Sequence, residues 1–127
     1  MEQEYIKGDI VMYDNKIHTI MDALGVNNYE LSYIEHTVHQ LELSGVPLTP
    51  EILEKNGWEK DKEASFKTQL YYRKKVGVRT IFVIIKEETS RVIYDSTCLR
   101  IIQYCHELQH LLFGLGLNSE MEVYVWK

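Results

Sequence analysis

The sequence has no long hydrophobic run and only two prolines. A membrane-spanning helix needs roughly 18 or more consecutive apolar residues, and no stretch approaches that length. The first residues, MEQEYIKGD, lack the basic and then apolar order of a signal peptide. We therefore expect a cytoplasmic protein that makes no membrane contact. With so few prolines and only seven glycines, a long linker is not expected either.

Cysteine is also scarce, since Cys98 and Cys105 are the two in the sequence. Both fall in a stretch with helical periodicity, where seven residues correspond to a rise of roughly 10.5 Å. A disulfide needs Cα atoms within about 7 Å, so we expect two reduced thiols. Neither cysteine belongs to a CxxC pair or to a repeated Cys/His spacing, which argues against a structural zinc knuckle.

The composition that remains is that of an ordinary globular domain, with 45% hydrophobic and 26% charged residues in 127. The charge is unevenly distributed. Residues 1–47 hold eight acidic and two basic side chains, a formal charge of −6, whereas residues 48–127 carry +1. An acidic first half repels phosphate, so nucleic acid is not the expected partner of that half.

The first half reads as a series of short strands. Residues 9–13 and 17–24 are rich in β-forming side chains, and the turn-prone Asp14-Asn15-Lys16 between them favours a tight hairpin. Residues 29–34 alternate apolar and polar side chains and predict a third strand, and residues 39–43 predict a fourth. This density of strands is typical of a small SH3-like barrel or a curled meander.

The second half begins with a predicted helix over 50–55, because Thr49 can cap it and a proline suits its first position. Residues 66–73 alternate like a half-buried strand. Residues 78–86 are apolar on both faces in their middle, which predicts a central strand, and residues 91–94 should pair with it antiparallel.

A long helix is predicted from the capping residues 95–97 to residue 113. Its apolar positions share one arc of about 120°, and we expect them to form the core face: Ile101, Tyr104, Cys105, Leu108, Leu111, Leu112 and Leu115. Gly114 and Gly116 should end the helix, and residues 121–126 predict a final strand. The expected fold is α+β, with a small β subdomain over 1–47 and an α+β subdomain over 48–127, or one continuous compact unit.

The helix carries an HExxH sequence at residues 106–110, which is the motif of zinc-dependent metallopeptidases. His106 and His110 share a helix face and can bind one Zn²⁺, while Glu107 can act as base toward the metal-bound water. A catalytic site needs a third protein ligand, and the extension HExxHxxGxxH fails here, because Phe113 and Gly116 occupy its glycine and third-histidine positions. Both histidines also lie opposite the predicted core stripe, which favours a solvated helix face.

A second candidate site is a cluster of cations around a predicted hairpin tip: Arg73, Lys74, Lys75 and Arg79. Tyr71 and Tyr72 lie beside them, and cations interleaved with aromatic rings suit nucleic acid. Charged hairpin tips are also common as simple solvated loops, and we favour that interpretation. Exposed tyrosines, of which the sequence has nine in all, can form a protein-binding face, and self-association into a homodimer stays open.

Three segments carry a family resemblance: YIKGDIVMYDNKIHTI, VPLTPEILEKNGWEK and YCHELQHLLFGLGLNSEMEV. They resemble a family of small uncharacterised proteins common in Bacteroides and related genomes, often beside phage-like or mobile elements. That family's segments read like "IPLTPEILEKCGF" and "YVHQLQNLYFALTG", so Glu107 and His110 match Gln and Asn there. The resemblance implies no established activity and a packing role for this helix.

Taken together, these features favour a non-enzymatic protein that acts through contacts with another protein, without a cofactor. The first alternative is a zinc-dependent hydrolase that uses His106, Glu107 and His110. The second is a nucleic-acid-binding accessory protein that uses the hairpin cations.

Overall fold

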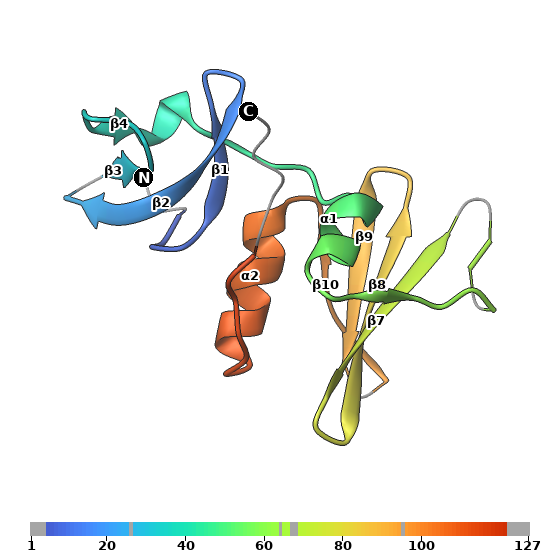
Figure 1. Ribbon diagram of the computed structural model, residues 1–127. Helices are drawn as coiled ribbons and strands as arrows, with labels where there is room; N and C mark the ends of the chain where they lie inside the picture. Colours follow the sequence, from blue (N-terminus) through green and yellow to red (C-terminus); the bar gives the residue numbers. More distant parts are fainter. Residues whose placement is uncertain (1–4, 26, 64, 67–68, 95, 122–127) are drawn as a thin grey trace. The chain divides into compact units, whose positions relative to one another are not determined.

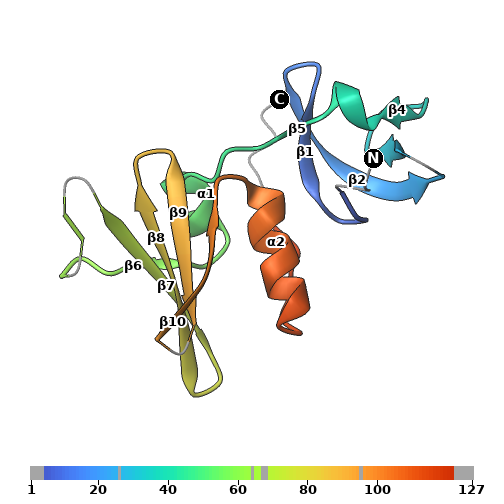
Figure 2. The ribbon, with the colours of Figure 1, turned by 180° about the vertical axis from the view of Figure 1, so that it is seen from behind.

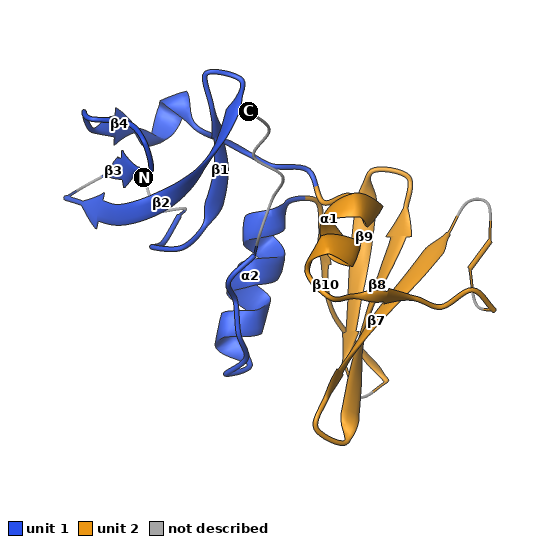
Figure 3. Cartoon of the chain, viewed as in Figure 1, with its two compact units in different colours: residues 1–47, 104–127 blue, residues 48–103 orange. Residues whose placement is uncertain are grey.

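The computed structural model describes residues 5–25, 27–63, 65–66, 69–94 and 96–121. The chain divides into two compact units (Figure 3). Unit 1 comprises residues 1–47 and 104–127, and unit 2 comprises residues 48–103. One division between the two units falls after Pro47. The predicted second subdomain, however, ends at Gln103, because the long helix belongs with the first 47 residues.

Unit 1 is built on a five-stranded antiparallel sheet with the order β4-β3-β2-β1-β5 (Figures 1 and 2). Its strands are β1 (Ile10–Tyr13), β2 (Lys16–Leu24), β3 (Asn28–Leu31), β4 (Val38–His39) and β5 (Ser44–Gly45), with a 3₁₀ helix, η1 (Gln40–Glu42), between the last two. The β1–β2 hairpin turns through Asp14 and Asn15, whose φ angles are 51° and 63°. Two consecutive positive φ angles give the turn that matches the twist of a hairpin.

The core of unit 1 lies on the inner face of this sheet. Its buried side chains are Tyr5, Val11, Ile20, Tyr29, Leu31, Val38 and Leu43, with Tyr13, Ala23 and Ile34 packed against them. The Tyr29 hydroxyl donates to Gln40 Oε1 at 2.8 Å and accepts from the Tyr5 amide at 3.3 Å. The register of β2 shifts between Ile20 and Asp22, and such a bulge bends a strand. Strands β1 to β4 are neighbours in chain order, as in a meander, and β5 pairs with β1. The sheet is open between β4 and β5.

Unit 2 holds the second antiparallel sheet, with the order β10-β9-β8-β7-β6 (Figure 2). Its elements are α1 (Pro50–Lys55), β6 (Glu59–Lys60), β7 (Leu70–Val76), β8 (Arg79–Lys86), β9 (Thr89–Tyr94) and β10 (Thr97–Ile102). The prediction for α1 is confirmed at both ends, with the Thr49 hydroxyl accepting from the Ile52 amide. The two units together give a mostly β structure with few helices, which agrees with the α+β class.

Helix α1 lies against one face of the unit 2 sheet (Figure 1). That face carries Tyr72, Val83 and Val92, which lie opposite one another on neighbouring strands and are all buried. The Tyr72 hydroxyl donates to Glu54 Oε2 at 2.8 Å. Burial, and then the hydrogen bond and negative charge of Glu54, raise the pKa of Tyr72 to about 12.

The long helix is shorter than predicted. Helix α2 spans Cys105–Gly114, and the residues expected to form its first turns, Thr97–Ile102, are strand β10. Apolar residues at 99, 101 and 102 suit a helix face or a strand equally, and pairing with β9 decides for the strand. Ile101, expected in the core stripe, is therefore 58% exposed. The helix ends as predicted near Gly116, where the Leu117 amide donates to the Leu112 carbonyl.

Several strand boundaries also differ from the prediction. The third strand ends at Leu31 because a turn follows, and most of residues 39–43 form η1 in place of a strand. The strand expected from residue 66 begins at Leu70, and residues 67–68 lie outside the described part. Of the expected final strand, residues 122–126 lie outside it as well, and Met121 is not in a strand. Within the described residues, no helix has the length and apolar character needed to span a membrane.

Candidate functional site

The HExxH residues do not form the solvated face that the sequence predicts. His106 is only 5% exposed, and its ring packs against Tyr5 and Tyr104 at centroid distances of 4.9 and 5.8 Å. Glu107 Oε1 accepts a hydrogen bond from the Tyr104 amide at 3.0 Å, which caps the start of α2. The prediction that the histidines face outward is therefore wrong for His106. The buried face of α2 includes His106, which packs against Tyr5.

The other end of the motif binds α2 to the segment before β1. His110 Nε2 lies 2.6 Å from Asp9 Oδ2, and Asp9 is buried. The same carboxylate oxygen accepts from the Ile6 amide at 2.9 Å. A buried carboxylate needs such partners, because an unpaired charge in a core is strongly unfavourable. His110 is thus the partner of a structural carboxylate.

Gln109 connects α2 to three backbone groups of unit 1. Its Oε1 accepts from the Ile10 amide at 3.0 Å, and its Nε2 donates to the carbonyls of Gly8 at 2.8 Å and Ser119 at 3.1 Å. One buried side chain therefore pairs three backbone groups, two of which belong to the segment entering β1. Each residue from His106 to His110 has a packing, capping or hydrogen-bonding role in unit 1.

A zinc site is not supported by this geometry. Among the described residues, no group of three or more His, Cys, Asp or Glu side chains is placed to hold a metal ion. Cys105 is buried at the start of α2, and this burial outweighs a backbone hydrogen bond and raises the pKa of its thiol to about 12. It is therefore a protonated thiol at neutral pH, and a thiol ligates metal only as the thiolate. Cys98 is exposed on β10, and neither cysteine forms a disulfide.

The four cations of the second candidate site do gather around the β7–β8 hairpin, whose tip is formed by Gly77 and Val78. Arg73 and Lys74 make contacts within unit 2. Arg73 bridges Glu59 and Asp61 at 3.2 and 3.3 Å, and Lys74 Nζ donates to the Asn56 carbonyl at 3.0 Å and lies 5.7 Å from the Trp58 ring centroid. Lys75 and Arg79 are exposed.

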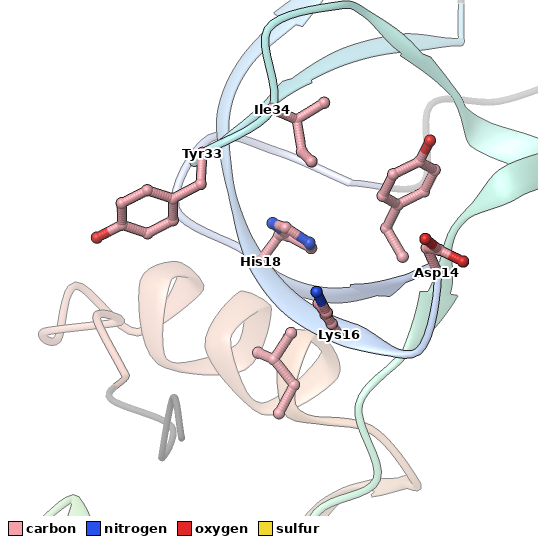
Figure 4. A pocket seen from close by; sticks show the side chains of 7 residues that line it. Asp14, Lys16, His18, Tyr33 and Ile34 are labelled. Atoms are coloured by element: carbon pink, nitrogen blue, oxygen red, sulfur yellow. The ribbon is translucent and has the colours of Figure 1, made fainter. Parts of the chain in front are cut away.

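Sequence reasoning did not identify a pocket at the β1–β2 end of the unit 1 sheet (Figure 4). Its volume is about 270 Å³, and its lining is contributed by the β1–β2 hairpin and by the loop after β3: Tyr13, Asp14, Lys16, Ile17, His18, Tyr33 and Ile34. Tyr13 and Ile34 also pack against the core, so the pocket opens at the edge of the core face. This volume lies just below the usual range of small-molecule sites, ~300–1,000 Å³, and suits a single side chain better than a cofactor.

His18 is the central polar group of this pocket (Figure 4). The residue is 8% exposed, and its Nδ1 lies 2.8 Å from the Ser32 carbonyl oxygen. Because a carbonyl only accepts, Nδ1 carries the proton in this contact, and the neutral ring presents Nε2 as an acceptor. Nε2 makes no hydrogen bond to the residues that the structure describes. The Tyr13 ring lies edge-on to His18, with a centroid distance of 5.9 Å.

Tyr33 stands at the rim of the pocket with its ring turned away from His18 (Figure 4). It is 93% exposed, and its φ angle is 64°. Of the six non-glycine residues with positive φ in the described part of the chain, Tyr33 is the only aromatic one. The left-handed conformation costs an L-residue with a large side chain roughly 1–2 kcal/mol. Unit 1 thus holds an aromatic ring in water on a strained backbone.

The pocket could not be found from a motif, because its residues have no catalytic or ligand spacing. The available signals were the Asp14-Asn15 hairpin and the tyrosines on either side of it, which the sequence suggests only as a protein-binding face. What brings residues 13–18 next to residues 33–34 is the path of the chain from β2 through β3. Comparisons with protein-family models, with curated proteins and with solved structures found no match to this chain.

Proposed function

We propose that this chain is a cytoplasmic, non-enzymatic protein that acts through protein contacts, and that its contact site is the pocket of unit 1. Its place beside phage-like or mobile elements belongs to the same proposal, and rests on the segment resemblance alone. The contacts of the HExxH residues support a non-enzymatic role, because Glu107, the base in the hydrolase alternative, caps the start of its own helix.

The observation that carries the proposal is the backbone and exposure of Tyr33. A strained conformation persists only when the surroundings impose it, and such strain concentrates at functional positions. Exposing a tyrosine ring contributes nothing to folding, whereas tyrosine is among the residues that most often anchor protein interfaces. The adjoining pocket, with apolar walls and an accepting nitrogen on His18, gives a partner's side chain a place to enter.

A barrel-like sheet is part of this proposal. In the order β4-β3-β2-β1-β5 the last strand returns to pair with the first, so joining the two edges would close an SH3-like barrel. The bulge in β2 provides the necessary bend. The pocket would then lie at the mouth of that barrel, a common position for binding sites.

Nucleic-acid binding is the second candidate, favoured by one observation in unit 2. Arg73, Lys74 and Lys75 line a cavity of about 240 Å³ together with Gly57 and Glu59. Because Glu59 and Asp61 already neutralise Arg73, this site would offer a phosphate less charge than its cation count suggests. We rank it below the unit 1 pocket for that reason.

Affinity capture with matched variants tests the proposal. Wild-type chain, Tyr33→Gly and Phe113→Ala would be immobilised, and the proteins retained from a lysate quantified by mass spectrometry. Phe113 is also an exposed aromatic residue, 65% exposed on α2 and outside the pocket. We expect a defined partner that is lost with Tyr33→Gly and kept with Phe113→Ala. Equal retention by all three chains would contradict a contact site at this pocket.

A further inference from the structure

We infer that the unit 1 pocket takes the side chain of an arginine from a basic segment of a partner protein. This inference rests on the proposed function and specifies the chemistry of its partner. It is carried by three observations on unit 1: the walls of the pocket, the polar groups that reach it, and the charge of the unit around it.

The walls suit a planar cation with an aliphatic stem. The rings of Tyr13 and His18 line it in edge contact with each other, and Ile17 and Ile34 contribute aliphatic surface. Cations are attracted to the faces of aromatic rings, and arginine stacks on them more often than lysine does. The three methylene groups of arginine would lie against the isoleucines while the guanidinium meets the rings.

The polar groups of the pocket are mainly acceptors. His18 Nε2 is left to accept because Nδ1 is occupied by the Ser32 carbonyl. Asp14 adds an exposed carboxylate from the hairpin turn, and no ion pair with a described residue engages it. A guanidinium carries five N–H donors in a planar fork and no acceptor, so it complements this set better than an ammonium or a carboxylate.

Among the described residues that line the pocket, Lys16 is the one with a positive charge. It lies beside Asp14 and His18 in Figure 4 and would repel an incoming cation. This arrangement makes the inference testable by sign. Removing the Lys16 charge should strengthen arginine binding, and removing the Asp14 charge should weaken it, whereas an anionic ligand would give both effects in reverse.

The charge of the whole unit favours the same partner. Unit 1 contains eleven acidic and three basic side chains, a formal charge of −8, whereas unit 2 contains eight acidic and eleven basic ones, or +3. A field of this sign attracts basic segments and raises their association rate, an effect that weakens as salt is added.

The experiment is an NMR titration of the full isotope-labelled chain with four short peptides, acetyl-Gly-Ser-X-Ser-Gly-amide, in which X is arginine, citrulline, lysine or glutamate. Citrulline has nearly the shape of arginine without its charge. We expect the arginine peptide to shift the resonances of His18, Tyr13 and Ile34, with the citrulline peptide about tenfold weaker. Asp14→Asn should weaken arginine binding about threefold and Lys16→Gln should strengthen it by a similar factor.

Tighter binding of the glutamate peptide, or reversed effects of the two charge variants, would overturn the inference. So would arginine-induced shifts that map outside the pocket and persist in Tyr33→Gly. If none of the peptides binds while a captured partner still depends on Tyr33, the arginine assignment fails and the proposed contact site stands. If capture also ignores Tyr33, the proposed function fails as well.

Discussion

Units 1 and 2 each contain a five-stranded antiparallel sheet, but they complete their cores in different ways. Unit 2 uses α1 and strands that follow one another without interruption from residue 48 to residue 103. Unit 1 adds a helix that follows its last strand only after the whole of unit 2, and fixes it through Gln109 and His110. Contacts between sequence neighbours can be read from a pattern, whereas contacts across 100 residues cannot.

The largest expected effect comes from removing Gln109, the side chain that joins α2 to the start of β1. Gln109→Ala removes three hydrogen bonds and leaves the Ile10 amide and the Gly8 carbonyl without their partner. We expect a loss of about 3 kcal/mol in the stability of unit 1, because buried unsatisfied backbone groups cost ~1–3 kcal/mol each. Hydrogen exchange should show faster exchange in β1 and α2 and unchanged exchange in β8 and β9. Phe113→Ala on the same helix is the control. Equal loss of protection in both units would contradict the view that Gln109 stabilises unit 1 alone.

That dependence on distant partners also explains how much could be predicted. The Asp14-Asn15 hairpin, α1, and β8 with β9 follow from local signals and are present. The start of the long helix was wrong because residues 97–102 are paired with β9, which periodicity cannot reveal. His106 was placed on the wrong face because Tyr5, which covers it, lies a hundred residues earlier. The pocket forms where the β1–β2 hairpin meets the loop after β3. Its residues are therefore separated in the sequence and make no recognisable motif.

A second, smaller effect concerns the fit between β5 and α2. A Cβ atom at Gly45 would lie 2.5 Å from Tyr104 Cγ, whereas one at Gly114 would meet nothing within 4 Å. Gly45→Ala should therefore destabilise unit 1 by about 2 kcal/mol through overpacking. Gly114→Ala, at the end of the helix, should stabilise it by up to ~1 kcal/mol. Chemical denaturation of both variants measures the difference, and equal effects would contradict the packing of Tyr104 over Gly45.

A third substitution, at Tyr33, should affect the stability of unit 1 and its partner binding in opposite directions. Tyr33→Gly should stabilise the fold by about 1 kcal/mol, because glycine adopts positive φ without strain. The same variant should lose the captured partner. Tyr33→Phe, which keeps the strained backbone and the ring, should leave the free energy of unfolding unchanged. Destabilisation by Tyr33→Gly would show that the tyrosine ring stabilises the folded state, and would contradict this expectation.

The stability of unit 2 should depend on alkaline pH through Tyr72. The pKa of Tyr72 is raised in the folded state from 10.0 to about 12. A raised pKa contributes stability that is complete below pH 10 and is lost as the pH rises toward 12. Between these values, unit 2 should lose stability to denaturant, and Tyr72→Phe should remove that part of the loss. An identical alkaline profile in wild type and variant would contradict the assignment.

The smallest expected effect is a difference in chemical labelling between the two cysteines, one of which lies in each unit. Cys98 is exposed on β10, and Cys105 is buried with a pKa of about 12. At pH 8, a thiol reagent should modify Cys98 readily and Cys105 only after denaturation, since the thiolate is the reactive form. Peptide mapping by mass spectrometry identifies the modified residue. Rapid native modification of Cys105 would show that the start of α2 is open.

We propose that α2 has a structural role and that this protein binds its partner through the unit 1 pocket. The most direct test compares partner retention by Glu107→Gln and Tyr33→Gly in the same affinity capture. Glutamine can still accept the Tyr104 amide hydrogen bond but cannot act as a base. We expect full retention by Glu107→Gln and loss of the partner with Tyr33→Gly. Loss with Glu107→Gln and full retention with Tyr33→Gly would contradict it and return the HExxH residues to the functional site.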